Sequence, residues 1–153
     1  MTQAENYVLL LERLGGVCNN TSYEVALFIL SSDAKLTKIA LPHISTEGIE
    51  FSAMLKHKSL YERDIKLLQI AYNLFHFNTN GYPSPYEISQ LGLPNLDIVT
   101  QAIYLASGLH RLNLCEDSDG RPLLEITTDR HDEAKRMQAG LTRFMQTAMV
   151  GDG

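Results

Sequence analysis

The chain has 153 residues, of which 44% are hydrophobic and 20% are charged, and its formal net charge is −5. This length is enough for one domain with its own hydrophobic core, and the composition is that of a soluble globular protein. Because an acidic chain repels phosphate backbones as a whole, nucleic-acid binding would need a local basic face. No apolar run approaches the roughly 18 residues that a membrane span needs, so we expect no membrane segment.

The expected location is the cytoplasm, or the host cytoplasm if a phage encodes the chain. The first residues, MTQAENY, are polar and lack the basic-then-apolar order of a signal peptide. Cys18 and Cys115 form no CxxC pair, and we expect both to be buried free thiols, as in a reducing compartment.

The first part of the chain predicts helices that begin at capping residues. Thr2 and Thr21 each stand three residues before a glutamate, which is the spacing of a capping box. Asp33 can cap a third, short segment that Pro42 closes, since proline disfavours helix in the residue before it. A weaker helix is expected within residues 43–58.

The stretch 59–77, SLYERDIKLLQIAYNLFHF, is predicted to be the central helix of the fold. Ser59 would cap it, and Glu62 would complete the capping box. Its apolar residues cover more than one side, which is typical of a helix that other helices surround. Residues 78–81, with two asparagines and a glycine, are expected to end it.

The second part of the chain predicts two helices, a hairpin and a last helix. Ser84 would cap a short helix that has proline at its first position, and Asn95 would begin a longer one. The turn sequence DSDG at 117–120 lies between two short apolar runs, which predicts a β-hairpin at 112–127. A long helix should follow from about residue 129 to 149.

The fold class expected from these elements is a mainly α, single-domain helical bundle over residues 1–150, with a small β-hairpin and a long C-terminal helix. Residues 151–153 would form a tail. No internal repeat, linker or low-complexity tract divides the chain.

The last helix carries a narrow apolar seam, which we define as Ala134, Met137, Leu141, Phe144 and Ala148. Their spacings of three and four residues are those of a coiled coil, but about two and a half heptads do not separate docking within the chain from a homodimer contact. Methionines also adapt to varied partner surfaces. The candidate partner-binding residues are Met137, Leu141, Phe144, Met145, Asp117 and Asp119.

Sequence patterns for catalysis are absent. The five histidines form neither HExxH nor HxH, and neither a glycine-rich phosphate loop nor GxSxG occurs. Asp129, His131, Asp132 and Glu133 cluster at a helix start, but a solvated first turn explains them as well as a metal ion does. We therefore expect no enzyme, no catalytic residue, no metal site and no cofactor.

The order of elements over 84–127 is also that of a winged helix-turn-helix. The sequence DSDGRPLLEIT before a long helix is similar to the wing and dimerisation helix of MarR-type repressors, which implies that the helix from Asn95 enters the major groove. No Lys or Arg occurs between Pro94 and His110, and Asp97 lies where phosphates would be met, so the charge disfavours DNA. The DNA-contacting residues of this alternative are Asn95, Thr100, Gln101 and Arg121.

The central stretch resembles a known family. The run DIKLLQIAYNLFHFN from Asp64, followed by Ser84-Pro85, Leu96-Asp97 and Gln101-Ala102-Ile103, is similar to the progression LAFNLYN, SP, LD, AI of a small helical domain family of unknown function. That family occurs in low-GC Gram-positive bacteria and their mobile elements. The resemblance covers roughly residues 7–112, implies no catalytic residue, and implies that the 95–110 helix belongs to a helical bundle.

We therefore expect a non-enzymatic interaction or regulatory protein that acts on a protein partner and is encoded by a phage or other mobile element, for example a counter-defence or regulatory inhibitor. A homodimer through the last helix is the second expected partner. The open alternatives are a MarR-like winged-helix regulator that binds DNA, and a small-molecule sensor with its pocket beside Tyr61, Tyr72 and Tyr86. In each case, residues 59–77 are expected to serve as a structural hub.

Overall fold

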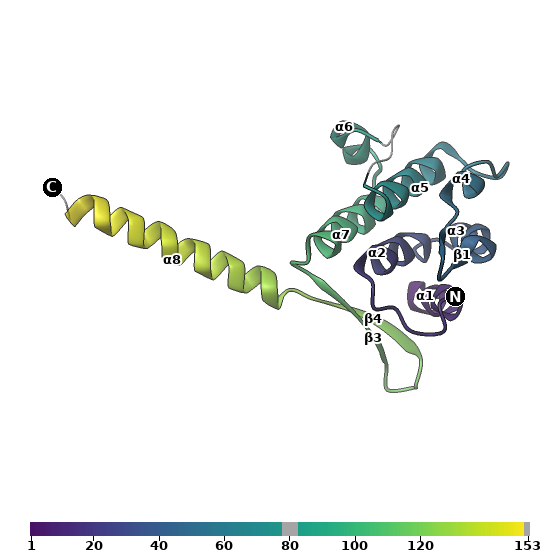
Figure 1. Ribbon diagram of the computed structural model, residues 1–153, viewed down its shortest axis with the longest axis horizontal. Helices are drawn as coiled ribbons and strands as arrows, with labels where there is room; N and C mark the ends of the chain where they lie inside the picture. The colour runs from purple at the N-terminus through teal and green to yellow at the C-terminus, as the bar shows by residue number, and fades with distance from the viewer. Residues whose placement is uncertain (78–82, 152–153) are drawn as a thin grey trace.

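The computed structural model describes residues 1–77 and 83–151. Most helices pack together, while α8 projects from them as an extended arm (Figure 1). The predicted fold class, mainly α with a hairpin and a long C-terminal helix, is confirmed. In chain order the elements are α1 (Gln3–Glu12), α2 (Thr21–Leu30), α3 (Ala34–Ala40), the 3₁₀ helix η1 (Leu41–His43), β1 (Ile44–Ser45), β2 (Gly48–Ile49), α4 (Phe51–Met54), α5 (Glu62–Phe75), α6 (Pro85–Ser89), α7 (Asn95–Ser107), β3 (Arg111–Glu116), β4 (Pro122–Thr127) and α8 (Asp129–Gly151).

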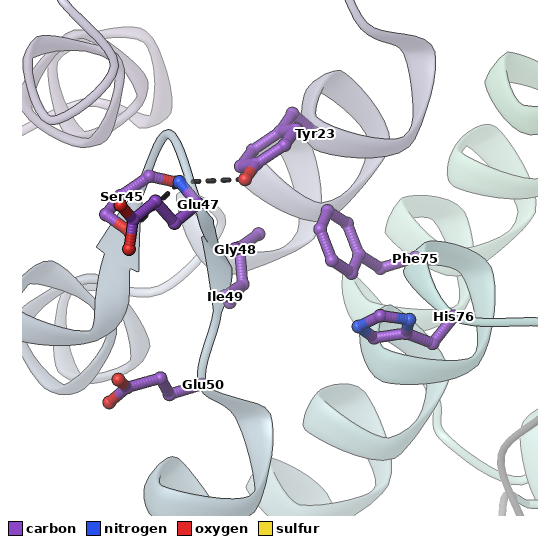
Figure 2. Close-up of a pocket in the computed structure, with 8 residues that line it drawn as sticks. All are labelled: Tyr23, Ser45, Glu47, Gly48, Ile49, Glu50, Phe75 and His76. Carbon is purple, nitrogen blue, oxygen red and sulfur yellow. Dashed lines mark hydrogen bonds between the residues drawn. The ribbon is translucent and has the colours of Figure 1, made fainter.

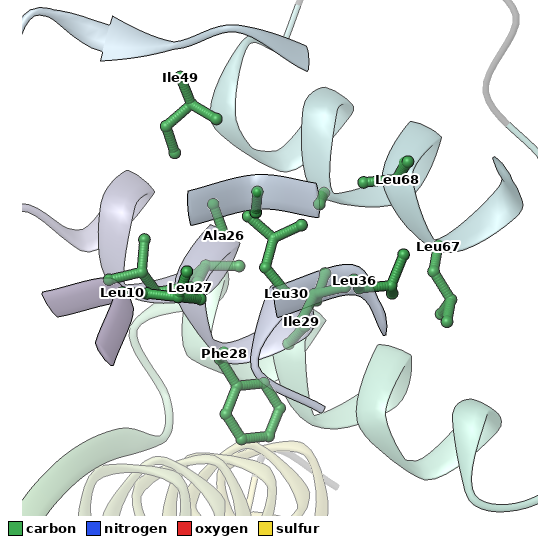
Figure 3. Packing of buried hydrophobic residues seen from close by; sticks show 14 of the residues in the cluster. Leu10, Ala26, Leu27, Phe28, Ile29, Leu30, Leu36, Ile49, Leu67 and Leu68 are labelled. Atoms are coloured by element: carbon green, nitrogen blue, oxygen red, sulfur yellow. The ribbon is translucent and has the colours of Figure 1, made fainter. Parts of the chain in front are cut away.

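Helix α2 lies at the centre of the packed helices. Each of its six last residues, from Val25 to Leu30, is 4% exposed or less, and α1, α3, α5 and α7 all contact it. Figure 3 shows Phe28 and Leu30 leaving α2 in different directions. A helix that is apolar all round has to be enclosed in this way.

The expected hub role of residues 59–77 is therefore corrected. Helix α5 buries one face, which includes Leu67, Leu68 and Ala71, against α2 and α7. Tyr61, just before the first residue of α5, is 71% exposed. The sequence of α5 is amphipathic, whereas that of α2 is apolar on every side, and this difference decides which helix is surrounded.

Two predicted caps are confirmed. The Thr2 hydroxyl accepts a hydrogen bond from the Glu5 N–H at 3.2 Å, and the Glu5 carboxylate accepts one from the Thr2 N–H at 2.8 Å. Ser84 accepts from the Glu87 N–H at 3.2 Å at the start of α6. These contacts satisfy N–H groups that have no partner within their helices.

At α2 the predicted cap was one residue too late. Asn20 is the capping residue, and its side-chain oxygen accepts from the N–H groups of Ser22 at 2.8 Å and Tyr23 at 3.3 Å. Asn is at least as good a cap as Thr, so Thr21 becomes the first helical residue.

Helix α5 also begins later than predicted, at Glu62. Asp64 accepts a hydrogen bond from the Tyr61 N–H at 2.9 Å, whereas Ser59 lies against His57. Burial by itself raises the pKa of the Asp64 carboxyl, but its hydrogen bonds with Lys35 and the Tyr61 N–H outweigh this and hold the pKa below its usual value. The Lys35–Asp64 ion pair thus joins α3 to the start of α5.

The helix predicted within 43–58 is largely wrong. Residues 44–49 form a two-stranded antiparallel ribbon, with Ile44 opposite Ile49, and only Phe51–Met54 is helical. Isoleucine favours extended backbone and Gly48 weakens a helix, and these local preferences prevail here over the apolar spacing.

The predicted hairpin forms from β3 and β4, with Leu112 opposite Ile126 and Leu114 opposite Leu124. Strand β4 lies against α1, and Leu112, Leu124 and Ile126 are partly buried against the core. The hairpin therefore covers one side of the packed helices and connects α7 to α8.

Two predictions concern residues at the limits of the described parts. The helix end predicted at 78–81 lies outside them, and α5 itself ends at Phe75. In the predicted tail at 151–153, Gly151 belongs to α8, and residues 152–153 lie outside the described residues.

The central position of α2 predicts a large effect of Leu30→Ala. Leu30 has no exposed surface, so truncation should lower the free energy of unfolding by about 2–5 kcal/mol through lost burial and a residual cavity. The control is Leu93→Ala at a side chain that is 75% exposed, where we expect a change within about 0.5 kcal/mol. Urea denaturation followed by circular dichroism measures both. Equal effects of the two substitutions would show that α2 is not the centre of the core.

Candidate functional site

Helix α8 is the element that the packed helices leave uncovered. It leads away from them along its whole length (Figure 1), and every side chain from Asp132 to Val150 is exposed. Four of the six candidate partner-binding residues lie here, and each is at least 57% exposed. They are Met137, Leu141, Phe144 and Met145. The structure therefore does not dock the apolar seam on the rest of the chain, which was one of the two predicted alternatives.

The apolar face of α8 becomes wider toward its C-terminal end. Met145 and Met149 lie on the side of the seam next to Leu141, about 40° and 80° around a helix of 3.6 residues per turn. Toward the N-terminal end, the seam has only Met137 and Ala134 and is surrounded by charged side chains. This asymmetry gives the two ends of α8 different surface chemistry.

The first turn of α8 is attached to the domain by four side chains, which we call the histidine cluster: Gln101, Tyr104, His110 and His131. His110 Nδ1 lies 2.6 Å from Gln101 Nε2, and His110 Nε2 lies 2.9 Å from His131 Nδ1. The Tyr104 ring stacks on the His110 ring with centroids 4.3 Å apart and an angle of 9° between planes. Helix α7, the loop after it and α8 therefore meet at one point.

The hydrogen bonds of the histidine cluster require a neutral His110. The Gln101 amide nitrogen donates to His110 Nδ1, so the ring proton lies on His110 Nε2 and is donated to His131 Nδ1. Burial lowers the pKa of His110, and His131 and Lys135 lower it further, while Asp132 acts in the opposite direction. A second proton on His110 would place two N–H donors against each other.

Sequence reasoning missed the histidine cluster. The sequence gives Gln101 a role only as a DNA contact of the winged-helix alternative. It places His131 only among the acidic residues at a helix start. Their partner His110 is separated from His131 by 21 positions, and no local spacing indicates that they meet. The relation depends on how the hairpin returns the chain to α7.

The two aspartates predicted at the hairpin tip have different roles. Asp117 Oδ1 accepts from the N–H groups of Asp119 and Arg121, both at 2.9 Å. Asp117 therefore stabilises the turn itself. Asp119 and Arg121 are exposed at the tip, where a partner could contact them.

The residues predicted to contact DNA are not presented together. Asn95 is buried at 9% exposure, and Gln101 is held in the histidine cluster. Thr100 is exposed, and Arg121 lies on the separate hairpin. The exposed positions of α7 contain no cation. They are Asp97, Thr100, Ile103, Ala106 and Ser107.

A recess of about 560 Å³ lies between β2 and the end of α5. Figure 2 shows Phe75 and His76 facing the strand at Gly48 and Ile49. The Tyr23 hydroxyl donates to the Ser45 carbonyl at 2.9 Å, and the Tyr23 and Phe75 rings meet edge to face with centroids 5.0 Å apart. Its wall is therefore aromatic on one side and backbone on the other.

The three tyrosines predicted to lie beside a sensor pocket have different surroundings in the described part of the chain. Tyr61 and Tyr86 are largely exposed, and Tyr72 packs against the Phe51 ring with centroids 5.0 Å apart. The recess beside β2 is lined by Tyr23 and by none of these three, and a pocket beside them stays a prediction.

Among residues 1–77 and 83–151, no three His, Cys, Asp or Glu side chains are placed to share a metal ion. The same part of the chain contains no helix with the length and apolar character needed to cross a bilayer. Cys18 and Cys115 are free, as predicted, but both are partly exposed and not buried. Burial nevertheless raises the pKa of the Cys18 thiol.

Comparisons with family models, curated proteins and solved structures return no match. The likeness of residues 7–112 to a helical family of unknown function stays a prediction. Function is therefore inferred from α8, the histidine cluster and the hairpin tip.

The histidine cluster predicts that acid loosens the contact between His110 and Gln101 of α7. A depressed pKa means that His110 stabilises the fold above its unfolded pKa of about 6.5 and that this contribution is lost as pH falls through the lower folded value. The N–H groups of Gly108 and His110 donate to the carbonyls of Leu105 and Tyr104. Their hydrogen exchange, corrected for intrinsic rates, should therefore be faster relative to α2 at pH 5 than at pH 7.5. His110→Gln should remove this difference, whereas His57→Gln, at an exposed loop position, should keep it. The same difference in both variants would exclude His110 as the cause.

Proposed function

We propose that the chain is a non-enzymatic interaction protein that regulates a protein partner, with α8 as its binding element. The observation that supports this is the exposure of Met137, Leu141, Phe144 and Met145 along one side of a helix that contacts the domain only at its first turn. A contiguous apolar surface rimmed by polar residues is typical of a protein interaction site.

The energies are consistent with a binding role. Four side chains of this type, if fully buried, contribute about 6–12 kcal/mol, whereas association costs about 4–15 kcal/mol in lost freedom. The seam alone therefore supports moderate affinity. Contacts near the start of α8, or at the exposed Asp119 of the hairpin tip, would add to it.

The regulatory role and its setting are part of the same proposal. We place the chain in the cytoplasm, as a counter-defence or other regulatory inhibitor of a phage or mobile element. The similarity of residues 7–112 to a helical family of Gram-positive bacteria and their mobile elements supports this setting. The described residues contain no group of three His, Cys, Asp or Glu side chains placed to hold a metal ion. The proposal therefore relies on the exposed surface of α8.

The binding role of α8 predicts that one charge on the seam abolishes capture of the partner. Leu141→Asp places a carboxylate among the apolar side chains, and its desolvation should weaken binding at least tenfold. Thr142→Asp is the matched control, because it adds the same charge at the next position, off the seam. Both variants and the unchanged chain would be immobilised and incubated with lysate of the source cell, and retained proteins would be identified by mass spectrometry.

We expect a protein that the unchanged chain and Thr142→Asp retain and Leu141→Asp loses. Circular dichroism checks that both variants keep the helical content. Retention of the same proteins by Leu141→Asp would show that the seam is not the binding element.

The second candidate is a winged-helix regulator of the MarR-like type. The order α6, α7, β3–β4 and α8 supports it, and α8 would then be the dimerisation helix. Against it, the exposed positions of α7 carry no cation and Asn95 is buried, although base and phosphate contacts rely on Arg and Lys.

The two candidates predict opposite results on DNA. We expect neither retention on heparin at moderate salt nor a mobility shift with mixed duplex DNA. DNA binding that weakens with salt and is lost in Arg121→Ala would favour the winged-helix candidate, because Arg121 is the one cation at the hairpin tip.

A further inference from the structure

The apolar residues of the seam on α8 have the spacing of a two-stranded coiled coil, in which another helix covers them. We infer that a second copy of this chain covers the seam, with the two α8 helices parallel. This inference rests on the proposed function, since it names the protein that α8 binds. The domain leaves α8 accessible beyond its first turn (Figure 1), so a second copy can approach the seam without displacing any packed element.

The positions of the seam fit a two-stranded coiled coil. In a heptad register, Ala134, Leu141 and Ala148 fall at a positions, and Met137 and Phe144 fall at d positions. Helix α8 has 23 residues, which corresponds to about 34 Å, and the seam occupies most of it. Two such helices can therefore pair over several turns.

The charges of α8 permit pairing with an identical helix. Between Ala134 and Ala148, the positions that flank the seam are uncharged, and the nearest charged flank, Glu133, faces an uncharged Gln138 of a parallel partner. Lys135, Arg136 and Arg143 lie on the outer side. Like charges therefore do not meet across the interface. The flanking positions are Gln138, Gly140, Met145 and Thr147.

Gly140 leaves additional room beside the seam. A glycine inside a helix is about 1 kcal/mol less favourable than alanine. No atom of the chain lies within 4 Å of the place where its Cβ would be, so packing within the domain does not require the small residue. A second helix that approaches at this position meets no side chain.

The distribution of charge along α8 favours the parallel orientation. From Met137 to Val150 the only charged residue is Arg143, and the apolar face is wide there. In a parallel pair, the wide apolar faces at the C-terminal ends of the two helices meet each other. In an antiparallel pair, Met149 of one helix meets the charged first turns of the other. The latter would desolvate charges or leave apolar surface exposed. The charged residues of those turns are Asp129, Arg130, Asp132, Glu133, Lys135 and Arg136.

Disulfide trapping tests both the partner and the orientation. Cys18→Ser and Cys115→Ser together remove the native thiols, and single cysteines are then introduced as Ala134→Cys, Ala148→Cys or, as an off-seam control, Thr142→Cys. All three positions are exposed on α8. After mild oxidation, covalent dimers are quantified by non-reducing electrophoresis, and light scattering gives the mass of the cysteine-free chain and of the unchanged chain.

We expect a mass of two chains at concentrations on the order of 100 µM, since a short coiled coil binds at micromolar level. Ala134→Cys and Ala148→Cys should each form covalent dimers alone, at least fivefold more than Thr142→Cys. Covalent dimers that form only when the Ala134→Cys and Ala148→Cys chains are mixed would overturn the parallel orientation.

A mass of one chain, with no covalent dimer above the Thr142→Cys level, would overturn pairing altogether. That result is separate from failure of the proposed function. Retention of a lysate protein that is lost in Leu141→Asp would then still show α8 to be a binding element for a different protein. If neither a dimer of this chain nor such a lysate protein is found, the proposed binding role of α8 is wrong.

Discussion

Enclosure of α2 is the constraint on which the rest of the structure depends. Because Val25 to Leu30 are buried on every side, four other helices have to supply apolar faces around one short segment. Polar side chains fix this arrangement where α2 ends: the Asn6 amide donates to the Ser31 carbonyl at 3.2 Å, and the Thr37 hydroxyl donates to the Leu30 carbonyl at 2.8 Å. These bonds satisfy buried backbone oxygens that the helix end would leave without partners. The core is therefore complete without any contribution from the seam of α8.

Completion of the core explains why α8 lies outside it. The hairpin β3–β4 closes the side of α1, and only the first turn of α8 returns to the domain, at His131. The seam of α8 stays exposed, and the exposure of apolar side chains is unfavourable in water. The helices α2, α5 and α7 hold the domain together, and α8 leaves its apolar seam exposed.

Local chemistry made much of this fold predictable, and long-range contacts made the rest unpredictable. The caps at Thr2 and Ser84, the turn at 117–120 and the spacing of the seam are properties of neighbouring residues, and the structure contains each of them. The prediction that residues 59–77 form the central helix was wrong. The apolar width of a single helix does not show which of two apolar helices the others surround. The ion pair of Lys35 with Asp64 and the bond of His110 with His131 join segments 29 and 21 positions apart, and no sequence spacing encodes them. The seam was thus found from sequence, while the cluster that attaches it was not.

The histidine cluster and the seam are connected through α8, which carries both His131 and the seam residues. His131 lies one turn before Ala134, so the bond to His110 fixes the direction in which the seam leaves the domain. In a parallel pair, that direction also sets the separation of the two domains and of their hairpin tips, where Asp119 is exposed. A second proton on His110 lies on Nδ1, where it opposes the Gln101 amide, while Nε2 still donates to His131. No titratable side chain lies within the seam. In a parallel pair, acid would therefore loosen the contact of His110 with α7 before it changed the contact between the two helices, because the titratable and apolar groups are separated along the chain.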